Sequence, residues 1–154
     1  MRDVMDQPPA ERRTAEEAAE IIARLAAMPG FGPAHGFETV AAEAGAVTLA
    51  VRSRPDLRYL NNYFHGGAIA GLAEQAAILC ATSVLPEGRI GATVELKLNN
   101  QRIAQGNRLF ALARVVNASP ALVVVEVRME VESLAGRGPC GVVLATLRAV
   151  PFVA

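Results

Sequence analysis

The sequence predicts an α+β domain in which a mainly antiparallel β-sheet wraps round one long central α-helix. Three observations support this fold class. Residues 67–85 form an apolar segment with helical periodicity that is too long for an ordinary strand. Two short segments with strand character precede this segment, and four longer ones follow it. A chain of 154 residues is also long enough for one domain with its own core.

The N-terminal part is predicted to contain a disordered tail and one amphipathic helix. Residues 1–13 are polar and aperiodic, which is typical of a frayed terminus. Thr14 and Glu17 have the spacing of a capping box, so the helix should begin there, and Pro29-Gly30 should end it. The apolar face of this helix comprises Ala18, Ile21, Ile22, Leu25 and Met28. We therefore expect a single domain at residues 14–154, which includes this helix.

Alternation of apolar and polar residues, together with turn residues, predicts the strands. Residues 37–43 and 47–53 flank Ala44-Gly45-Ala46 and indicate a hairpin, and residues 55–64 are irregular. The long helix that follows should bury one face, made of Ile69, Leu72, Ala73, Ala76, Leu79 and Cys80. Four strands should then form a meander, at residues 94–99, 109–116, 123–132 and 142–150, with a break at residues 136–139.

Composition argues against several classes of function. The net charge is zero and acids and bases are interspersed, so we expect no nucleic-acid partner and no membrane partner. The first residues lack the apolar region of a signal peptide, which favours a cytoplasmic protein. Cys80 and Cys140 have neither metal-ligand spacing nor the density of a disulfide framework, although a single bridge stays an alternative.

Glu74 is the only formally charged residue between Arg58 and Glu87, and it follows the segment His65-Gly66-Gly67. A carboxylate without a cation nearby in the sequence either faces solvent or has a chemical role. The glycines open the predicted helix, where unpaired backbone N–H groups and the helix dipole can stabilise a developing negative charge. Purely structural alternatives are an exposed glutamate, a histidine that only caps the helix or is buried, and glycines that only allow close packing.

This motif and the order of the elements resemble the hotdog-fold acyl-CoA thioesterases, in particular the phenylacetate-pathway type and its 4-hydroxybenzoyl-CoA relatives. The resemblance covers roughly residues 30–150 and includes residues 91–98, which look like the strand that follows the helix in that family. It implies a hotdog fold and hydrolysis of an acyl-CoA thioester without a metal or an organic cofactor. It also implies self-association as a homodimer or a dimer of dimers.

The resemblance further implies roles for individual residues. Gly66 matches the glycine whose backbone N–H polarises the thioester carbonyl, and His65 shapes the loop before it. Glu74 matches the catalytic acid, and Thr93 lies near a position where a hydroxyl group helps to place the water or the acid. These roles agree with the chemistry, because thioester hydrolysis needs donors at the forming oxyanion and a carboxylate that activates water or attacks directly.

The chain departs from the family pattern next to this motif. Tyr59 stands six residues before His65, where the family usually has Asn or Gln. Either Tyr59 donates through its hydroxyl, or the loop shifts and Asn61 or Asn62 takes that role. Asn62 replaces a common glycine, which is compatible with its tolerance of left-handed backbone angles. Residues 101–104 replace the usual arginine and proline, so the end of this strand should have its own shape.

Helix geometry predicts that the site is shared between two chains. Gly66 and Glu74 are eight residues apart, which is about 12 Å along a helix and too far for both to act on one carbonyl. We therefore expect Gly66 of one protomer to face Glu74 of another across a two-fold axis.

Two other functions stay open, a hotdog dehydratase acting on a hydroxyacyl thioester and a non-catalytic acyl-CoA-binding protein. The direct succession of His65, Gly66 and Gly67 favours the thioesterase over the dehydratase. The phosphates of coenzyme A require cations, and the sequence offers Arg102, Arg108, Arg114, Arg128 and Arg137 without choosing among them.

Overall fold

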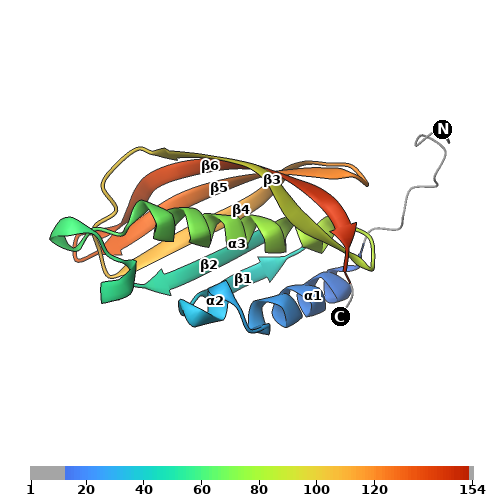
Figure 1. The fold of residues 1–154 in the computed structure, drawn as a ribbon, viewed down its shortest axis with the longest axis horizontal. Helices are drawn as coiled ribbons and strands as arrows, with labels where there is room; N and C mark the ends of the chain where they lie inside the picture. The colour runs from blue at the N-terminus through green and yellow to red at the C-terminus, as the bar shows by residue number, and fades with distance from the viewer. Residues whose placement is uncertain (1–12, 153–154) are drawn as a thin grey trace.

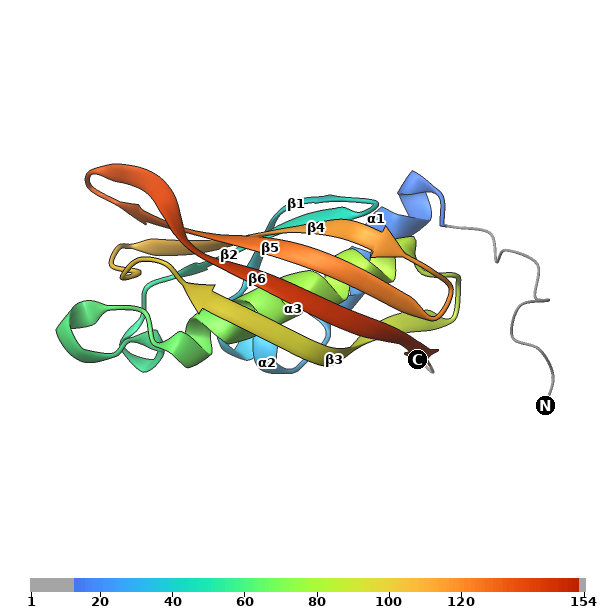
Figure 2. The same cartoon turned by 90° about the horizontal axis from the view of Figure 1, so that it is seen from above.

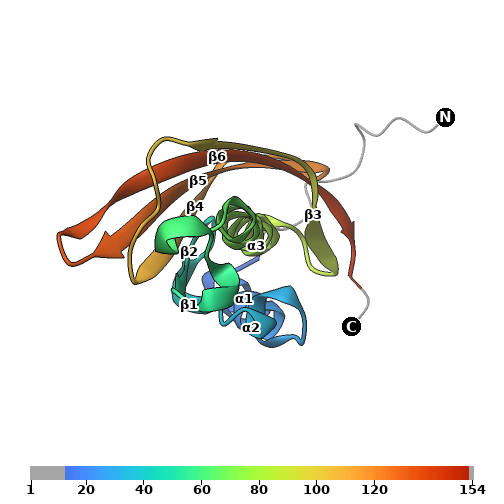
Figure 3. The same cartoon turned by 60° about the vertical axis from the view of Figure 1, so that its left-hand side comes forward.

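The centre of the fold is helix α3 (Gly66–Val84), and a six-stranded antiparallel sheet curves round it (Figures 1 and 3). The computed structural model describes residues 13–152. All six apolar residues that were predicted to form the buried face of this helix are buried. The predicted fold class is therefore confirmed.

By length and composition alone, α3 resembles a membrane-spanning helix, because an 18-residue window has a mean hydropathy of 1.4. However, 61% of that window is buried inside the fold. Apolar residues on most sides of a helix are also what a central core helix requires, and α3 lies in that position.

The sheet order is β1-β2-β4-β5-β6-β3, so the predicted meander of the last four strands is wrong. Strand β3 follows α3 directly in the chain but pairs with β6 at one edge of the sheet, and Figure 2 shows β3 and β6 side by side. Alternation identifies a strand without saying which strand lies next to it. The strands are β1 (Glu38–Glu43), β2 (Ala46–Arg52), β3 (Arg89–Asn100), β4 (Arg108–Ala118), β5 (Leu122–Ser133) and β6 (Gly136–Pro151).

The break predicted at residues 136–139 is also wrong, because β6 already begins at Gly136. Pro139 pairs with Glu130 of β5, whereas the pairing of β6 with β3 begins only at Gly141. The missing N–H of Pro139 therefore costs no bond to β3.

Two helices lie on the side of α3 that faces away from the sheet, as Figure 3 shows. Helix α1 (Ala15–Ala27) begins with the predicted capping box, in which Thr14 and Glu17 exchange hydrogen bonds. The short helix α2 (Phe31–Ala34) was not predicted from the sequence. The irregular segment before α3 contains the 3-10 turns η2 (Pro55–Leu57) and η3 (Leu60–Asn62). Of the predicted tail, residues 1–12 lie outside the described residues.

Candidate active site

The N-terminus of α3 presents a free backbone donor. His65 is the N-cap residue, and its Nδ1 accepts a hydrogen bond of 2.9 Å from the N–H of Gly67. Nδ1 is therefore unprotonated, and a neutral imidazole carries its proton on Nε2. The N–H of Gly66 has no hydrogen-bond partner within the described residues. His65 thus caps the helix, as one structural alternative held, and leaves Gly66 available to a ligand.

Gly66 borders a hollow of about 370 Å³ between the loop before α3 and the connection from β3 to β4. These segments lie together at one end of the molecule in Figure 1. Isolated bridges from Arg58 to Phe64 and from Tyr63 to Gln105 hold the loop in this position. The lining includes the aromatic rings before the helix and the end of β3, namely Tyr59, Tyr63, Phe64, Ile69, Asn100, Gln101, Arg102, Ile103 and Ala104.

The loop brings Tyr59, and neither asparagine, to this hollow. Asn61 and Asn62 have φ values of 58° and 61°, so Asn62 does adopt the left-handed conformation expected of it. Two consecutive left-handed residues fold the chain back, and the N–H of Tyr59 donates to the carbonyl of Tyr63 at 2.7 Å. The Asn62 side chain instead accepts a long hydrogen bond, 3.4 Å, from Arg58.

Tyr59 also contacts the capping histidine. Its ring lies edge-on to the ring of His65, with centroids 5.7 Å apart and an interplanar angle of 73°. The residue remains 61% exposed. The phenol therefore stands at the mouth of the hollow, beside the helix N-terminus.

Glu74 lies outside this hollow, on the exposed face of α3. Its carboxylate makes no hydrogen bond or ion pair to any residue from 13 to 152. Gly67, Gly71 and Ile78 share this face, because they lie three or four residues from one another along the helix. Within one protomer, the structure does not bring Glu74 and Gly66 together.

Thr93 is on β3 and pairs with the buried Leu147, so its side chain points to the inner face of the sheet. Its Oγ1 is buried and has no hydrogen-bond partner in the part of the chain that the structure describes. Thr93 does not border the hollow either. Of the predicted site residues, Gly66 and Tyr59 line the hollow and His65 lies next to Gly66 at the start of the helix. Asn62, Glu74 and Thr93 do not line it.

Residues 61–135, which hold the helix and the three strands after it, match the family described as the thioesterase superfamily. The chain thus has a hotdog domain whose residues 61–135 carry the sequence pattern of the thioesterase superfamily. The matched segment begins in the loop that holds Asn61 and includes Gly66, Glu74 and Thr93. A comparison with curated proteins finds no match to the sequence.

Solved structures share the fold of this thioesterase domain. A thioesterase family protein from Silicibacter pomeroyi has a TM-score of 0.84 at 22% identity, over 88% of this chain and 99% of that chain. The Escherichia coli PaaI protein from the phenylacetic acid degradation operon has a TM-score of 0.77 at 13% identity, over 88% and 95%. A mutant of the Staphylococcus aureus thioesterase SAV0944 has a TM-score of 0.70 at 19% identity, over 77% and 97%.

The arginines of the thioesterase domain differ in how they are paired. Arg108 donates to Glu38 at 2.8 Å, Arg128 to Glu126 at 3.1 Å, and Arg137 pairs with Glu130. Arg114 is exposed on β4. Arg102 alone among the five candidates borders the hollow that contains Gly66, and it also borders a second hollow of about 240 Å³.

Both cysteines of the thioesterase domain are free and buried. Burial raises the pKa of the Cys80 thiol to about 12 and that of Cys140 to about 11. The disulfide alternative is therefore not present in this structure. Within residues 13–152, no group of three or more His, Cys, Asp or Glu side chains could hold a metal ion.

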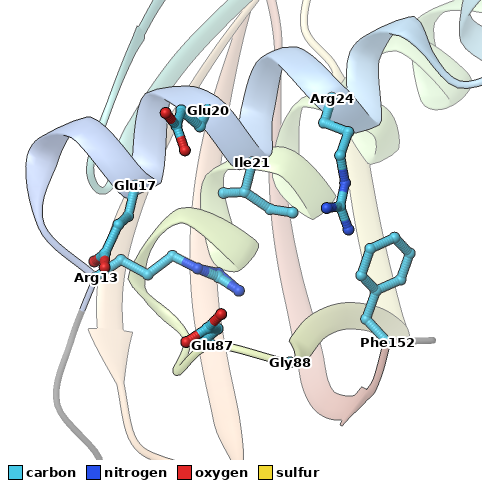
Figure 4. A pocket seen from close by; sticks show the side chains of 8 residues that line it. All are labelled: Arg13, Glu17, Glu20, Ile21, Arg24, Glu87, Gly88 and Phe152. Atoms are coloured by element: carbon cyan, nitrogen blue, oxygen red, sulfur yellow. The ribbon is translucent and has the colours of Figure 1, made fainter. Parts of the chain in front are cut away.

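Another hollow, of about 300 Å³, lies between α1 and the C-terminal strand end and is shown in Figure 4. Arg13 extends there toward Glu87 and donates to the carbonyl of Thr82 at 2.8 Å. Arg24 lies over the ring of Phe152 at 4.9 Å. The Arg13 contact fastens the start of α1 to the end of α3, and the Arg24 contact joins α1 to the end of β6. None of the predicted site residues lines this hollow.

Proposed function

We propose that this thioesterase hydrolyses acyl-CoA in the cytoplasm, in a site formed by two copies of the chain. The observation that most supports this proposal is that the N–H of Gly66 is free at an open hollow, whereas Glu74 lies outside that hollow. The eight-residue separation of these groups corresponds to about 12 Å along the helix. A second copy with its Gly66 opposite Glu74 would place donor and acid on either side of one carbonyl.

The chemistry follows from these two groups. Glu74 takes a proton from water as the water oxygen bonds to the thioester carbon, and the carbonyl oxygen becomes an oxyanion. The N–H of Gly66 of the partner subunit donates to this oxyanion, assisted by the positive end of the α3 dipole. The intermediate then expels the CoA sulfur, which receives the proton from Glu74. Direct attack by Glu74, with later hydrolysis of the anhydride, uses the same two groups.

Tyr59 is proposed to orient the water or the acid through its hydroxyl. It lines the hollow beside Gly66, and it lies fifteen residues before Glu74. Two solved structures of SAV0944 have alanine in place of a glutamine and a glutamate, which are also fifteen residues apart in that chain. The Tyr59 phenol would therefore take the place of a side-chain amide that lies the same number of residues before the acid in the sequence.

Arg102 is the proposed partner of a CoA phosphate. Three of the other four candidate arginines already pair with a carboxylate, which satisfies part of their charge. Arg102 connects the hollow at Gly66 with the second hollow, and the neighbouring Ile103 is 65% exposed. An apolar surface followed by a cation fits the pantetheine arm and the phosphates that continue from it.

Strand β3 is the proposed edge for pairing the two copies. It lies at the end of the sheet, and Val94 is 60% exposed at a bulge in this strand. An unpaired edge with an exposed apolar side chain gains from association with a second copy. Assembly as a homodimer or a dimer of dimers follows.

The test is thiol release from a panel of acyl-CoA thioesters, with wild-type protein and with Glu74→Gln. We expect turnover by the wild type that the variant lacks, and a higher KM in Arg102→Gln than in the matched surface variant Arg114→Gln. Absence of thiol release across the panel would contradict the proposed reaction. Binding without turnover would favour the non-catalytic acyl-CoA-binding protein, and water elimination from a hydroxyacyl-CoA would favour the dehydratase.

A further inference from the structure

An exposed aromatic ring lies on the same helix face as Glu74. The ring of Phe31, from α2, rests directly on α3 at Gly71, where an added Cβ would come within 2.6 Å of a ring carbon. Gly71 is therefore the position that allows α2 to pack so closely on α3. Gly71 precedes Glu74 by three residues, so the two are neighbours on the helix surface, about 4.5 Å apart along its axis.

The position of Phe31 is fixed from several sides. The carbonyl of Phe31 accepts a hydrogen bond of 2.8 Å from Nδ1 of His35, and the two rings lie 4.2 Å apart. Phe37 meets the ring edge-on at 5.7 Å. The next residue, the buried Gly32, packs on the side chain of Gln75, one turn along α3 from Gly71. A ring that is held this firmly needs no further contact for its own stability.

Phe31 nevertheless remains 53% exposed. A fixed, half-exposed aromatic ring beside an unpaired carboxylate provides an apolar surface next to the reacting group. In the shared site, CoA approaches along the hollow of one protomer, so the acyl group must extend along the other protomer, past Glu74. Phe31 rests on that protomer at Gly71, within one helical turn of Glu74.

We propose that Phe31 determines acyl specificity by forming the apolar surface that the acyl chain contacts while Glu74 acts. This inference rests on the proposed function, because it requires Glu74 to be the catalytic acid. An acetyl group is too short to reach one helical turn beyond the carboxylate, whereas a hexanoyl chain reaches it. The ring therefore favours the longer acyl group.

The experiment compares kcat/KM for hexanoyl-CoA with kcat/KM for acetyl-CoA. In Phe31→Ala the ratio should fall by roughly tenfold, the scale of a lost apolar contact in a binding site. In Gly71→Ala the new methyl group displaces the ring without changing its chemistry, so the ratio should fall as well. Leu122→Ala removes a similarly exposed apolar side chain at the start of β5, outside both hollows, and should leave the ratio unchanged.

The outcomes separate this inference from the proposed function. A wild type that hydrolyses neither thioester would overturn both. A wild type that hydrolyses hexanoyl-CoA, with an unchanged ratio in the variants, would overturn the role of Phe31 alone. Equal losses for both thioesters, together with weaker self-association, would mean that the ring contacts a partner subunit instead of the acyl chain. If Phe31→Ala does not fold, Gly71→Ala tests the role of Phe31 instead. This variant should keep helix α3, because alanine is a better helix former than glycine.

Discussion

Two inactive variants should restore activity to each other if the site is shared between chains. One variant is Glu74→Ala, which lacks the acid. The other is Gly66→Pro, which lacks the N–H at the start of α3. Proline fits this position because it is the first helical residue, and because His65 before it has an extended backbone with φ −64° and ψ 141°. No atom lies within 4 Å of a Cβ added to Gly66, so the first atom of the new side chain meets no obstacle.

The expected recovery follows from the pairing of the chains. In each mixed dimer one site carries both defects and the other carries neither. Random pairing of equal amounts makes half of the dimers mixed, so the mixture should regain about a quarter of the wild-type activity per site. If both groups acted within one chain, every site would carry a defect and no activity would return.

The assay is thiol release from an acyl-CoA after the two variants are unfolded together and refolded. Different affinity tags on the two chains show that mixed dimers have formed. Gly66→Ala is the matched control, because it adds a side chain but keeps the N–H, and it should retain far more activity than Gly66→Pro. No recovery in verified mixed dimers would refute the shared site and the mechanism proposed for it.

Three further predictions concern the acid, the phenol and the thiols. Glu74→Gln should lower kcat by at least about a hundredfold with little change in the melting temperature, since it removes the base but keeps the shape; turnover within a fewfold of wild type would contradict the assignment. Tyr59→Phe should lower kcat by roughly tenfold and leave KM unchanged, because one hydrogen bond in the transition state is lost. Unchanged kinetics would show that the hydroxyl has no role. Cys80 and Cys140 should react with a disulfide reagent only after unfolding, because burial raises the pKa of each thiol. Rapid labelling of the folded protein near neutral pH would contradict their burial. The raised pKa values also contribute to the free energy of unfolding. This contribution is complete below the usual thiol pKa of 9.0 and should decline as the pH rises above it, because the thiols of the unfolded chain ionise first.

The sequence by itself determined the elements whose signals are local. The capping box of Thr14 and Glu17 and the buried face of α3 are interactions between residues close in the chain, and both were found as expected. The isolation of Glu74 is also a property of the sequence. Its exposure in the protomer agrees with two predictions at once, a surface glutamate and an acid that meets a second chain.

The tertiary structure decided which distant segments meet. Strand β3 pairs with β6 at the edge of the sheet, because packing round α3 selects the neighbours and alternation does not. Among Tyr59, Asn61 and Asn62, only the tyrosine borders the hollow, because two left-handed residues turn the loop back on itself. Phe31 contacts Gly71, which is forty residues away in the sequence, and no local sequence pattern predicts this contact. Local periodicity thus determined the elements, whereas the contacts that shape the site depend on long-range packing that only the folded chain provides.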